Sequence, residues 1–292
     1  MAKSTVTQHK SLKGTYNLRG AYDLRGTYNL RGTYKESLKV LLPYGMLATK
    51  QWLAKQGLSP HALDNAVKTE TLLPLATGVY SQYSRSISWE GVVASMQRMA
   101  KEDAESVPPV IVGGLSALTL SGLSQYVSLG RSPHIHLYTQ AKLPTWLARL
   151  SLPMKFEGHR TNKLWPEWLL RDKAFIKENE WEADRPPVYF SCPEKAMLEL
   201  LADIPDAVTF EHANELMQGM VNLSPRKLDA LLKACNSIKV KRLFFWLAKR
   251  HNYAWFGKLN VADYDLGSGK RVIVKNGKLN TDYWITVPAH MD

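Results

Sequence analysis

The chain has only two cysteines among its 292 residues, Cys192 and Cys235, and they lie far apart in the sequence. Neither has metal-ligand partners nearby at the spacings typical of a metal site, so no metal and no cofactor is expected. Two free thiols are most economical in a reducing compartment, which favours a cytoplasmic protein.

Long hydrophobic runs are also lacking. No apolar segment approaches the roughly 20 residues needed to cross a bilayer, and the first ten residues, MAKSTVTQHK, contain no apolar stretch of the kind found in a secretory signal. Hydrophobic residues still make up 45% of the chain, which excludes wholesale disorder, and a length of 292 residues is enough for two domains. We therefore expect a folded cytoplasmic protein with no membrane partner.

Acidic residues are scarce in the N-terminal third. Residues 1–100 contain 13 Lys or Arg against 5 Asp or Glu, a net of +8 out of +12 for the whole chain. Residues 101–200 contain 12 of each, and residues 201–292 contain 13 against 9, a net of +4. Basic segments gain free energy by releasing the counterions of a phosphate backbone, so nucleic acid is the first partner to consider. A solvated basic surface is the alternative.

The pattern from residue 45 to residue 83 predicts a helix, a tight turn, a second helix and a hairpin, which is the order of a winged helix-turn-helix. Thr49 and Ser59 are suitable N-caps, because a hydroxyl accepts a hydrogen bond from an unpaired helical N–H group. Gly57 suits the end of the first helix, and Gly78 suits the turn of the hairpin. An ordinary helical hairpin in a globular core is the alternative interpretation.

A short turn between two helices lets the first support the second, whose N-terminal end can enter a major groove. Leu63, Ala66 and Val67 recur at helical spacing, so they are expected to face inward and to leave the polar residues outside. The expected DNA-binding residues lie at the starts of both helices and along the outer face of the second: Thr49, Lys50, Gln51, Ser59, His61, Asn65 and Lys68.

Residues 15–34 contain a hexapeptide repeat, TYNLRG, AYDLRG, TYNLRG and TY. A period of six is too short for a helical solenoid unit, and the glycine in each copy breaks a helix. We expect residues 1–36 to form a flexible arm. DNA contacts through the Tyr and Arg side chains of the arm are the alternative.

Residues 105–292 are expected to form a larger mixed α/β domain. The run 110–123 predicts a strand, a Gly-Gly turn and a helix, followed by a second strand from His134 to Tyr138. The turn Gly113–Ser116 could hold a phosphate at a helix N-terminus, and it is similar to the opening of nucleotidyltransferases. Their chemistry needs two carboxylates on the next strand to hold Mg²⁺, and that strand offers His134 and His136 instead, so we expect no enzyme.

The segment 237–251, SIKVKRLFFWLAKRH, predicts a basic amphipathic helix. Five basic side chains are expected to face outward and to offer a surface to nucleic acid or to an acidic protein: Lys239, Lys241, Arg242, Lys249 and Arg250. A solvated face without a partner is the alternative. Near the C-terminus, Asn276-Gly277 between the runs 272–274 and 283–287 predicts a hairpin.

Several motifs, in this order, resemble those of the AbiEi-type antitoxins of type IV toxin–antitoxin systems, a bacterial group linked to abortive phage infection. The resemblance rests on the predicted winged helix and on four segments: GGLSALTLSGLSQYVSLG at 113–130, SCPEKAMLELL at 191–201, SIKVKRLFFWLAKRH at 237–251 and DLGSGKRVIVKNGKLNTDYWITVP at 265–288. It covers residues 37–290 and leaves out the repeat arm.

The resemblance implies an α+β protein with a winged helix-turn-helix DNA-binding domain at 37–104 and an antitoxin domain at 105–292. Such a protein represses its own operon and counteracts a toxin with a nucleotidyltransferase-like fold, without being an enzyme. Its partners would be operator DNA upstream of its own gene and the cognate toxin.

The resemblance also places four residues on DNA-facing elements. Lys50 and Lys68 would contact phosphates, whereas His61 and Asn65 would reach base edges. Two alternatives stay open: a module that neutralises the toxin by direct contact, and a nucleotide-binding enzyme that uses the Gly113–Ser116 turn.

Overall fold

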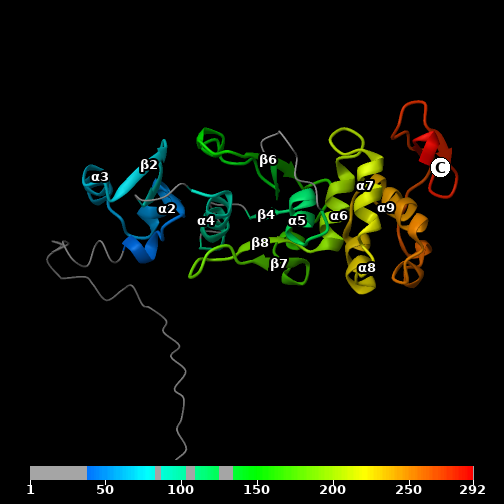
Figure 1. Ribbon diagram of the computed structural model, residues 1–292, viewed down its shortest axis with the longest axis horizontal. Helices are drawn as coiled ribbons and strands as arrows, with labels where there is room; N and C mark the ends of the chain where they lie inside the picture. The colour runs from blue at the N-terminus through cyan, green and yellow to red at the C-terminus, as the bar shows by residue number, and fades with distance from the viewer. Residues whose placement is uncertain (1–37, 83–86, 103–108, 125–133, 292) are drawn as a thin grey trace, which may run out of the picture.

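The computed structural model describes residues 38–82, 87–102, 109–124 and 134–291, so the predicted arm at 1–36 lies outside it. The molecule is elongated, with the winged-helix elements at one end and the C-terminal helices at the other (Figure 1). Within the described residues, no helix is long and apolar enough to cross a membrane. The predicted α+β class, a winged helix-turn-helix domain followed by a larger domain with a mixed sheet, is confirmed.

The N-terminal domain has the element order of a winged helix. Residues 38–41 are helical. The elements that follow are β1 (Leu47–Thr49), α2 (Lys50–Lys55), α3 (Pro60–Lys68), β2 (Leu72–Ala76) and β3 (Val79–Gln82). The three strands form an antiparallel sheet of order β1-β3-β2, in which β2 and β3 are the wing.

The predicted caps hold these helices. The Thr49 hydroxyl accepts a hydrogen bond from the backbone N–H of Trp52 at 3.2 Å, and the Ser59 hydroxyl accepts one from Ala62 at 3.1 Å. Gly57 adopts φ +93°, a conformation that L side chains rarely adopt, and this allows the chain to turn sharply between the two helices. Local sequence signals therefore define the starts of both helices and the turn between them.

Helix α4 (Trp89–Glu102) joins the winged helix to the C-terminal sheet. On one side, the Ser95 hydroxyl accepts a hydrogen bond from the N–H of Leu47 in β1 at 2.9 Å. On the other side, the Gln97 amide donates to the carbonyls of Val110 (3.1 Å) and Tyr189 (2.7 Å) and accepts from the N–H of Tyr189 (2.8 Å). Because buried amide groups must be paired, these bonds fix α4 to both neighbours.

The C-terminal domain is built on a five-stranded sheet of order β6-β5-β4-β8-β7. Its strands are β4 (Val110–Val112), β5 (His134–Thr139), β6 (Lys155–Arg160), β7 (Ile176–Asn179) and β8 (Val188–Ser191). The pairs β4–β8 and β5–β6 are parallel, whereas β4–β5 and β7–β8 are antiparallel. The predicted strand-helix-strand segment is present, with α5 (Gly114–Leu120) between two antiparallel strands.

Four further helices cover the sheet and extend the domain: α6 (Pro193–Ala202), α7 (Phe210–Gln218), α8 (Pro225–Ala234) and α9 (Ile238–His251). Short 3-10 helices complete it: Leu147–Arg149, Glu167–Leu170, Lys173–Phe175, Phe256–Lys258, Val261–Asp263 and Ala289–Met291. Cys192 and Cys235 are both buried and unpaired, as predicted. Burial is the main cause that raises the pKa of Cys192 to about 12 and that of Cys235 to about 11, so neither thiol is reactive near neutral pH.

The predicted C-terminal hairpin has a different register from the one expected. Strands β9 (Lys278–Asn280) and β10 (Ile285–Val287) pair around a turn at 281–284, and the Asn276-Gly277 turn comes before β9. The segment 272–274 is not a strand. The side chain of Thr286 accepts hydrogen bonds from the N–H groups of Ile273 (2.8 Å) and Val274 (3.0 Å) and therefore replaces the backbone partner that a strand would need.

Candidate nucleic-acid interface

Helix α3 lies at the end of the molecule opposite the C-terminus (Figure 1). Leu63 and Ala66 anchor its inner face and are only 2% and 1% exposed. Four polar residues of the helix are exposed: His61, Asp64, Asn65 and Lys68. The predicted division into an apolar inner stripe and a polar outer face is therefore present.

Two of the exposed side chains are paired with each other. The amide nitrogen of Asn65 lies 3.1 Å from Nε2 of His61, one helical turn earlier. When that ring nitrogen accepts, the amide is held with its carbonyl oxygen still free to accept a second bond. The hydrogen bond to His61 holds the Asn65 side chain in place on the outer face. An amide held in this way can bond the N6 and N7 edge of adenine with one donor and one acceptor.

The start of α2 is joined to the wing. The backbone N–H of Lys50 donates to the carbonyl of Gly78 in the wing turn at 2.8 Å, while the side chains of Lys50 and Gln51 are exposed. Thr49 is oriented differently, because its hydroxyl donates to the sulfur of Met99 in α4 at 3.9 Å. Of the seven predicted residues, six are exposed, and only Thr49 faces the interior of the domain pair.

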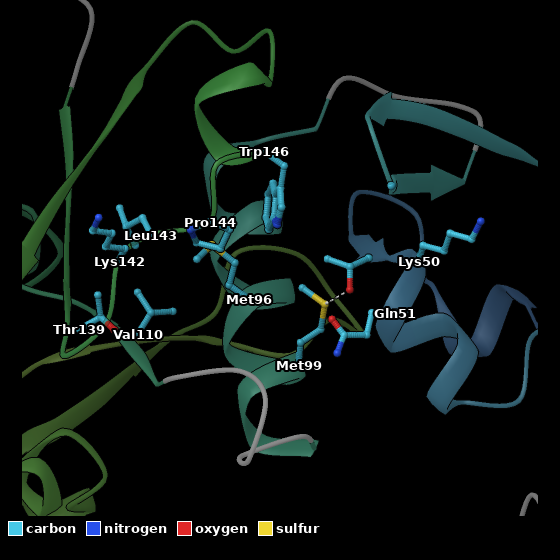
Figure 2. A pocket seen from close by; sticks show the side chains of 12 residues that line it. Lys50, Gln51, Met96, Met99, Val110, Thr139, Lys142, Leu143, Pro144 and Trp146 are labelled. Carbon is cyan, nitrogen blue, oxygen red and sulfur yellow. Dashed lines mark hydrogen bonds between the residues drawn. The ribbon is translucent and has the colours of Figure 1, made fainter.

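A cavity of about 380 Å³ separates this end of α2 from the C-terminal domain. Its floor is formed by Met96 and Met99 of α4, and its far wall by residues that follow β5, among them Trp146 (Figure 2). Figure 2 shows the Lys50 side chain pointing away from this cavity. The Lys50 ammonium is therefore turned to solvent, where a phosphate could reach it.

The wing itself carries no charge. Between Leu72 and Gln82 there is no Lys, Arg, Asp or Glu, and Leu73 is 41% exposed. The wing strands therefore cannot form ion pairs with phosphates. In this part of the domain, Lys50 and Lys68 provide the positive charge beside the outer face of α3.

The predicted basic surface of α9 is wrong for Lys241 and Arg242, which are only 5% and 3% exposed. Arg242 donates to the carbonyls of Leu266 (2.6 Å), Gly269 (2.7 Å) and Trp284 (3.1 Å). These bonds hold the C-terminal segment against the helix. The amphipathic pattern predicted an exposed face here because it does not show that later residues cover it.

The other three basic residues of α9 are engaged as well. Lys239 donates to the carbonyls of Ala202 (2.7 Å), the last residue of α6, and Ile204 (2.6 Å) just beyond it. Two side chains face solvent near the C-terminal end of α9: Lys249 pairs with Asp282 at 2.6 Å, and Arg250 donates to the carbonyl of Met291. A continuous basic face for a partner is therefore not formed by this helix.

The Gly113–Ser116 turn is occupied by the protein's own side chains and is not a phosphate cradle. The N–H of Gly114 donates to the carboxylate of Glu199 at 3.1 Å, so an internal anion already takes the place of a phosphate. A Cβ at Gly113 would lie 2.3 Å from the ring of Tyr138, which closes the space above the turn. The nucleotide-binding hypothesis for this turn is contradicted by this packing.

A cluster on β5 and β6 was missed from the sequence. The parallel register places His136 opposite Glu157 and Tyr138 opposite His159, all on one face of the sheet. Nδ1 of His136 lies 2.9 Å from Nε2 of His159, and Nδ1 of His159 lies 3.4 Å from the carboxylate of Asp203. The alternation in each strand's sequence predicts that its polar residues share one face. Only the pairing of β5 with β6 shows that the polar faces of the two strands adjoin each other.

Environment separates the two imidazoles. Burial, together with the nearby positive charge of a protonated His159, lowers the pKa of His136. Burial also opposes protonation of His159, but its hydrogen bond to Asp203 and the charge of that carboxylate outweigh this effect and raise its pKa. Of the two rings, His136 is therefore the one favoured in the neutral form near pH 7.

Comparison with known proteins gives family matches to two consecutive parts of the chain. Residues 34–129 match the family described as transcriptional regulator, AbiEi antitoxin N-terminal domain, and residues 132–288 match transcriptional regulator, AbiEi antitoxin, type IV TA system. The crystal structure of the RV2827C protein from Mycobacterium tuberculosis is similar, with a TM-score of 0.50 and 13% identity over 86% of this chain and 89% of that chain. This second likeness shows the fold alone.

A search of the curated proteins found no match. The family matches together span residues 34–288, and the C-terminal one alone covers more than half of the 292 residues. This chain therefore belongs to the AbiEi antitoxin family, the transcriptional regulators of type IV toxin–antitoxin systems.

Proposed function

We propose that this chain represses its own toxin–antitoxin operon by placing α3 in the major groove of operator DNA. The observation that carries the proposal is the exposed polar face of α3 on a winged helix whose inner stripe, caps and turn are all in place. Residues 37–104 would act as the DNA-binding domain, and residues 105–292 as the antitoxin domain that counteracts a nucleotidyltransferase-like toxin.

The contacts divide by chemistry. Lys50 at the start of α2 and Lys68 at the end of α3 are exposed cations, which suits phosphate contacts that position the protein without reading sequence. His61 and Asn65 lie on the exposed face of α3 and have the donors and acceptors needed at base edges. Helix α4 is hydrogen-bonded to β1 through Ser95 and to the C-terminal sheet through Gln97, so a change in the C-terminal domain could reach the winged helix through these contacts.

The test is a binding titration of the full chain against two duplexes of equal length: the DNA upstream of its own gene, and the same base composition in scrambled order. The proposal predicts tighter binding to the upstream DNA, by about 10³-fold or more, and affinity that falls steeply as salt rises. Equal, weak binding to both duplexes at every salt concentration would overturn it.

The toxin part of the proposal needs its own measurement. Co-expression with the neighbouring toxin gene should relieve growth arrest in the wild type. A variant that has lost operator binding, such as Asn65→Ala combined with Lys50→Ala, should still relieve it if residues 105–292 carry the antitoxin activity. Loss of protection in that variant would show that the two activities are not divided between the domains.

A further inference from the structure

The cluster on β5 and β6 has the composition of a metal centre. Among the described residues, His136, Glu157 and His159 each offer one ligand atom, and the three atoms lie within 4.8 Å of one another. We propose that these three side chains bind one divalent transition-metal ion of the Zn²⁺ class. Two imidazoles and a carboxylate are ligands that Zn²⁺ commonly takes in proteins.

Two of the three distances between the ligand atoms are close to those around such an ion, and the third lies within 4.8 Å. Zn²⁺ bonds nitrogen and oxygen at about 2.0–2.2 Å, so ligand atoms around a tetrahedral ion lie about 3.3 Å from one another. Nδ1 of His136 is 2.9 Å from Nε2 of His159 and 3.8 Å from Oε2 of Glu157. Shifts of a few tenths of an ångström would bring both pairs to the required separation.

The two imidazoles also point one ring nitrogen each at the other. At 2.9 Å, one ring nitrogen must donate and the other accept, because two N–H groups would repel and two lone pairs would repel. A cation between them accepts both lone pairs at once. When the proton between the rings moves from Nδ1 to Nε2 of His136, two nitrogen lone pairs and a carboxylate oxygen face one point.

Asp203 supplies the support that metal-binding histidines need. The ring nitrogen of His159 that would not bind the ion lies 3.4 Å from the Asp203 carboxylate. Tyr138 stacks on the same ring, with centroids 4.6 Å apart and planes 10° apart, and fixes its orientation. A carboxylate behind a histidine fixes its tautomer and raises its basicity, an arrangement that recurs behind metal ligands.

The ion has a path to the cluster. Glu157 is 43% exposed at its side chain, whereas His136 and His159 are 17% and 13% exposed. A polar cavity of about 480 Å³ borders His159 and Asp203. Three protein ligands leave one coordination position, which a water molecule or an anion from this cavity would take.

The experiment uses the full chain without a polyhistidine tag, freed of metal by a chelator and titrated with Zn²⁺ in a calorimeter. One ion per chain is expected. Glu157→Gln should weaken binding at least tenfold, and His136→Gln and His159→Gln should abolish stoichiometric binding. Asp203→Asn should weaken it by about 10–100-fold, because it supports a ligand without being one. Co²⁺ should give the visible spectrum of a tetrahedral site in the wild type and lose it in the two histidine variants.

His290→Gln is the matched control, since His290 also pairs with a carboxylate, Glu211 at 2.8 Å, on an exposed surface away from the cluster. It should bind Zn²⁺ as the wild type does. Absence of stoichiometric binding in the wild type, or equal binding in all variants, would overturn the proposal. If a histidine variant fails to fold, as judged by circular dichroism, Glu157→Gln decides the matter, because its partly exposed side chain can be replaced without opening the core.

Discussion

Helices α3 and α9 both place polar and basic residues opposite an apolar stripe, and the structure uses them in opposite ways. The outer residues of α3 face solvent, and the structure commits none of them to a buried contact. In α9, Arg242 and Lys241 are covered, and Arg242 bonds three backbone carbonyls. A basic residue at the right helical position is therefore available to a partner only when no later segment of the chain covers it.

The largest effect on stability is expected at Glu199 of α6, where a buried charge is fully committed to the fold as Arg242 is in α9. This fully buried carboxylate lies 2.5 Å from the ammonium of Lys195 and accepts bonds from Trp165 (3.3 Å) and the N–H of Gly114 (3.1 Å). Glu199→Ala leaves the Lys195 charge without its partner, so the free energy of unfolding should fall by about 3–5 kcal/mol. Urea unfolding followed by circular dichroism measures the loss.

An exposed ion pair provides the control for that measurement. Lys249 and Asp282 are each more than half exposed, and Asp282→Ala should cost about 0–1 kcal/mol because water screens the pair. Similar losses for Glu199→Ala and Asp282→Ala would mean that the buried pair does not stabilise the C-terminal domain as its burial indicates.

The next effect is expected at Arg242. Arg242→Ala removes charge-assisted bonds to three carbonyls and should lower the free energy of unfolding by about 1.5–3 kcal/mol or more. Affinity for operator DNA, measured by fluorescence anisotropy below the unfolding transition, should stay unchanged. The opposite pattern, with stability kept and DNA affinity lost, would show that α9 contacts nucleic acid and would break the comparison.

A third effect concerns sequence reading by α3. Asn65→Ala should reduce the discrimination between operator and scrambled DNA by about 1–3 kcal/mol, because an amide that bonds a base edge in two places cannot be replaced by a methyl group. His61→Ala is informative beside it, since it frees the Asn65 amide from its ring partner. Equal losses on both duplexes for Asn65→Ala would contradict its role as a base reader.

The smallest effect is expected at Lys50. Lys50→Ala should weaken binding to operator and scrambled DNA alike and should reduce the slope of log affinity against log salt by about 1. Lys258→Ala, an exposed lysine in the C-terminal domain, is the matched control and should leave the slope unchanged. A slope that falls equally in both variants would indicate a general charge effect and not a contact at the start of α2.

Much of the winged helix could be predicted from the sequence because its signals are local. Ser59 caps α3 by accepting a bond from the N–H three residues later, and Gly57 allows a turn between its immediate neighbours. Periodicity then separates Leu63 and Ala66 from the exposed face. The C-terminal hairpin was placed in the wrong register because the decisive contact, from Thr286 to Ile273 and Val274, joins residues more than ten positions apart.

The cluster on β5 and β6 could not be predicted either, because it also depends on contacts between residues that are distant in the sequence. The sequence contains His136 and His159 on separate strands, more than twenty residues apart, and nothing near either of them indicates the other. The parallel register of the two strands brings His136, Glu157 and His159 together, and the position of Asp203 after α6 adds the fourth group.

The sequence by itself determined the winged-helix elements, their caps and turns, and the ordered motifs that indicate the family, because each depends on neighbours within one or two helical turns. The tertiary structure alone decided which basic residues face solvent, which anion occupies the Gly114 turn and which histidines meet. All three outcomes depend on contacts between residues that are far apart in the sequence. A long basic side chain, for example, can reach either water or a distant carbonyl, and the segment that packs beside it decides which of these it meets.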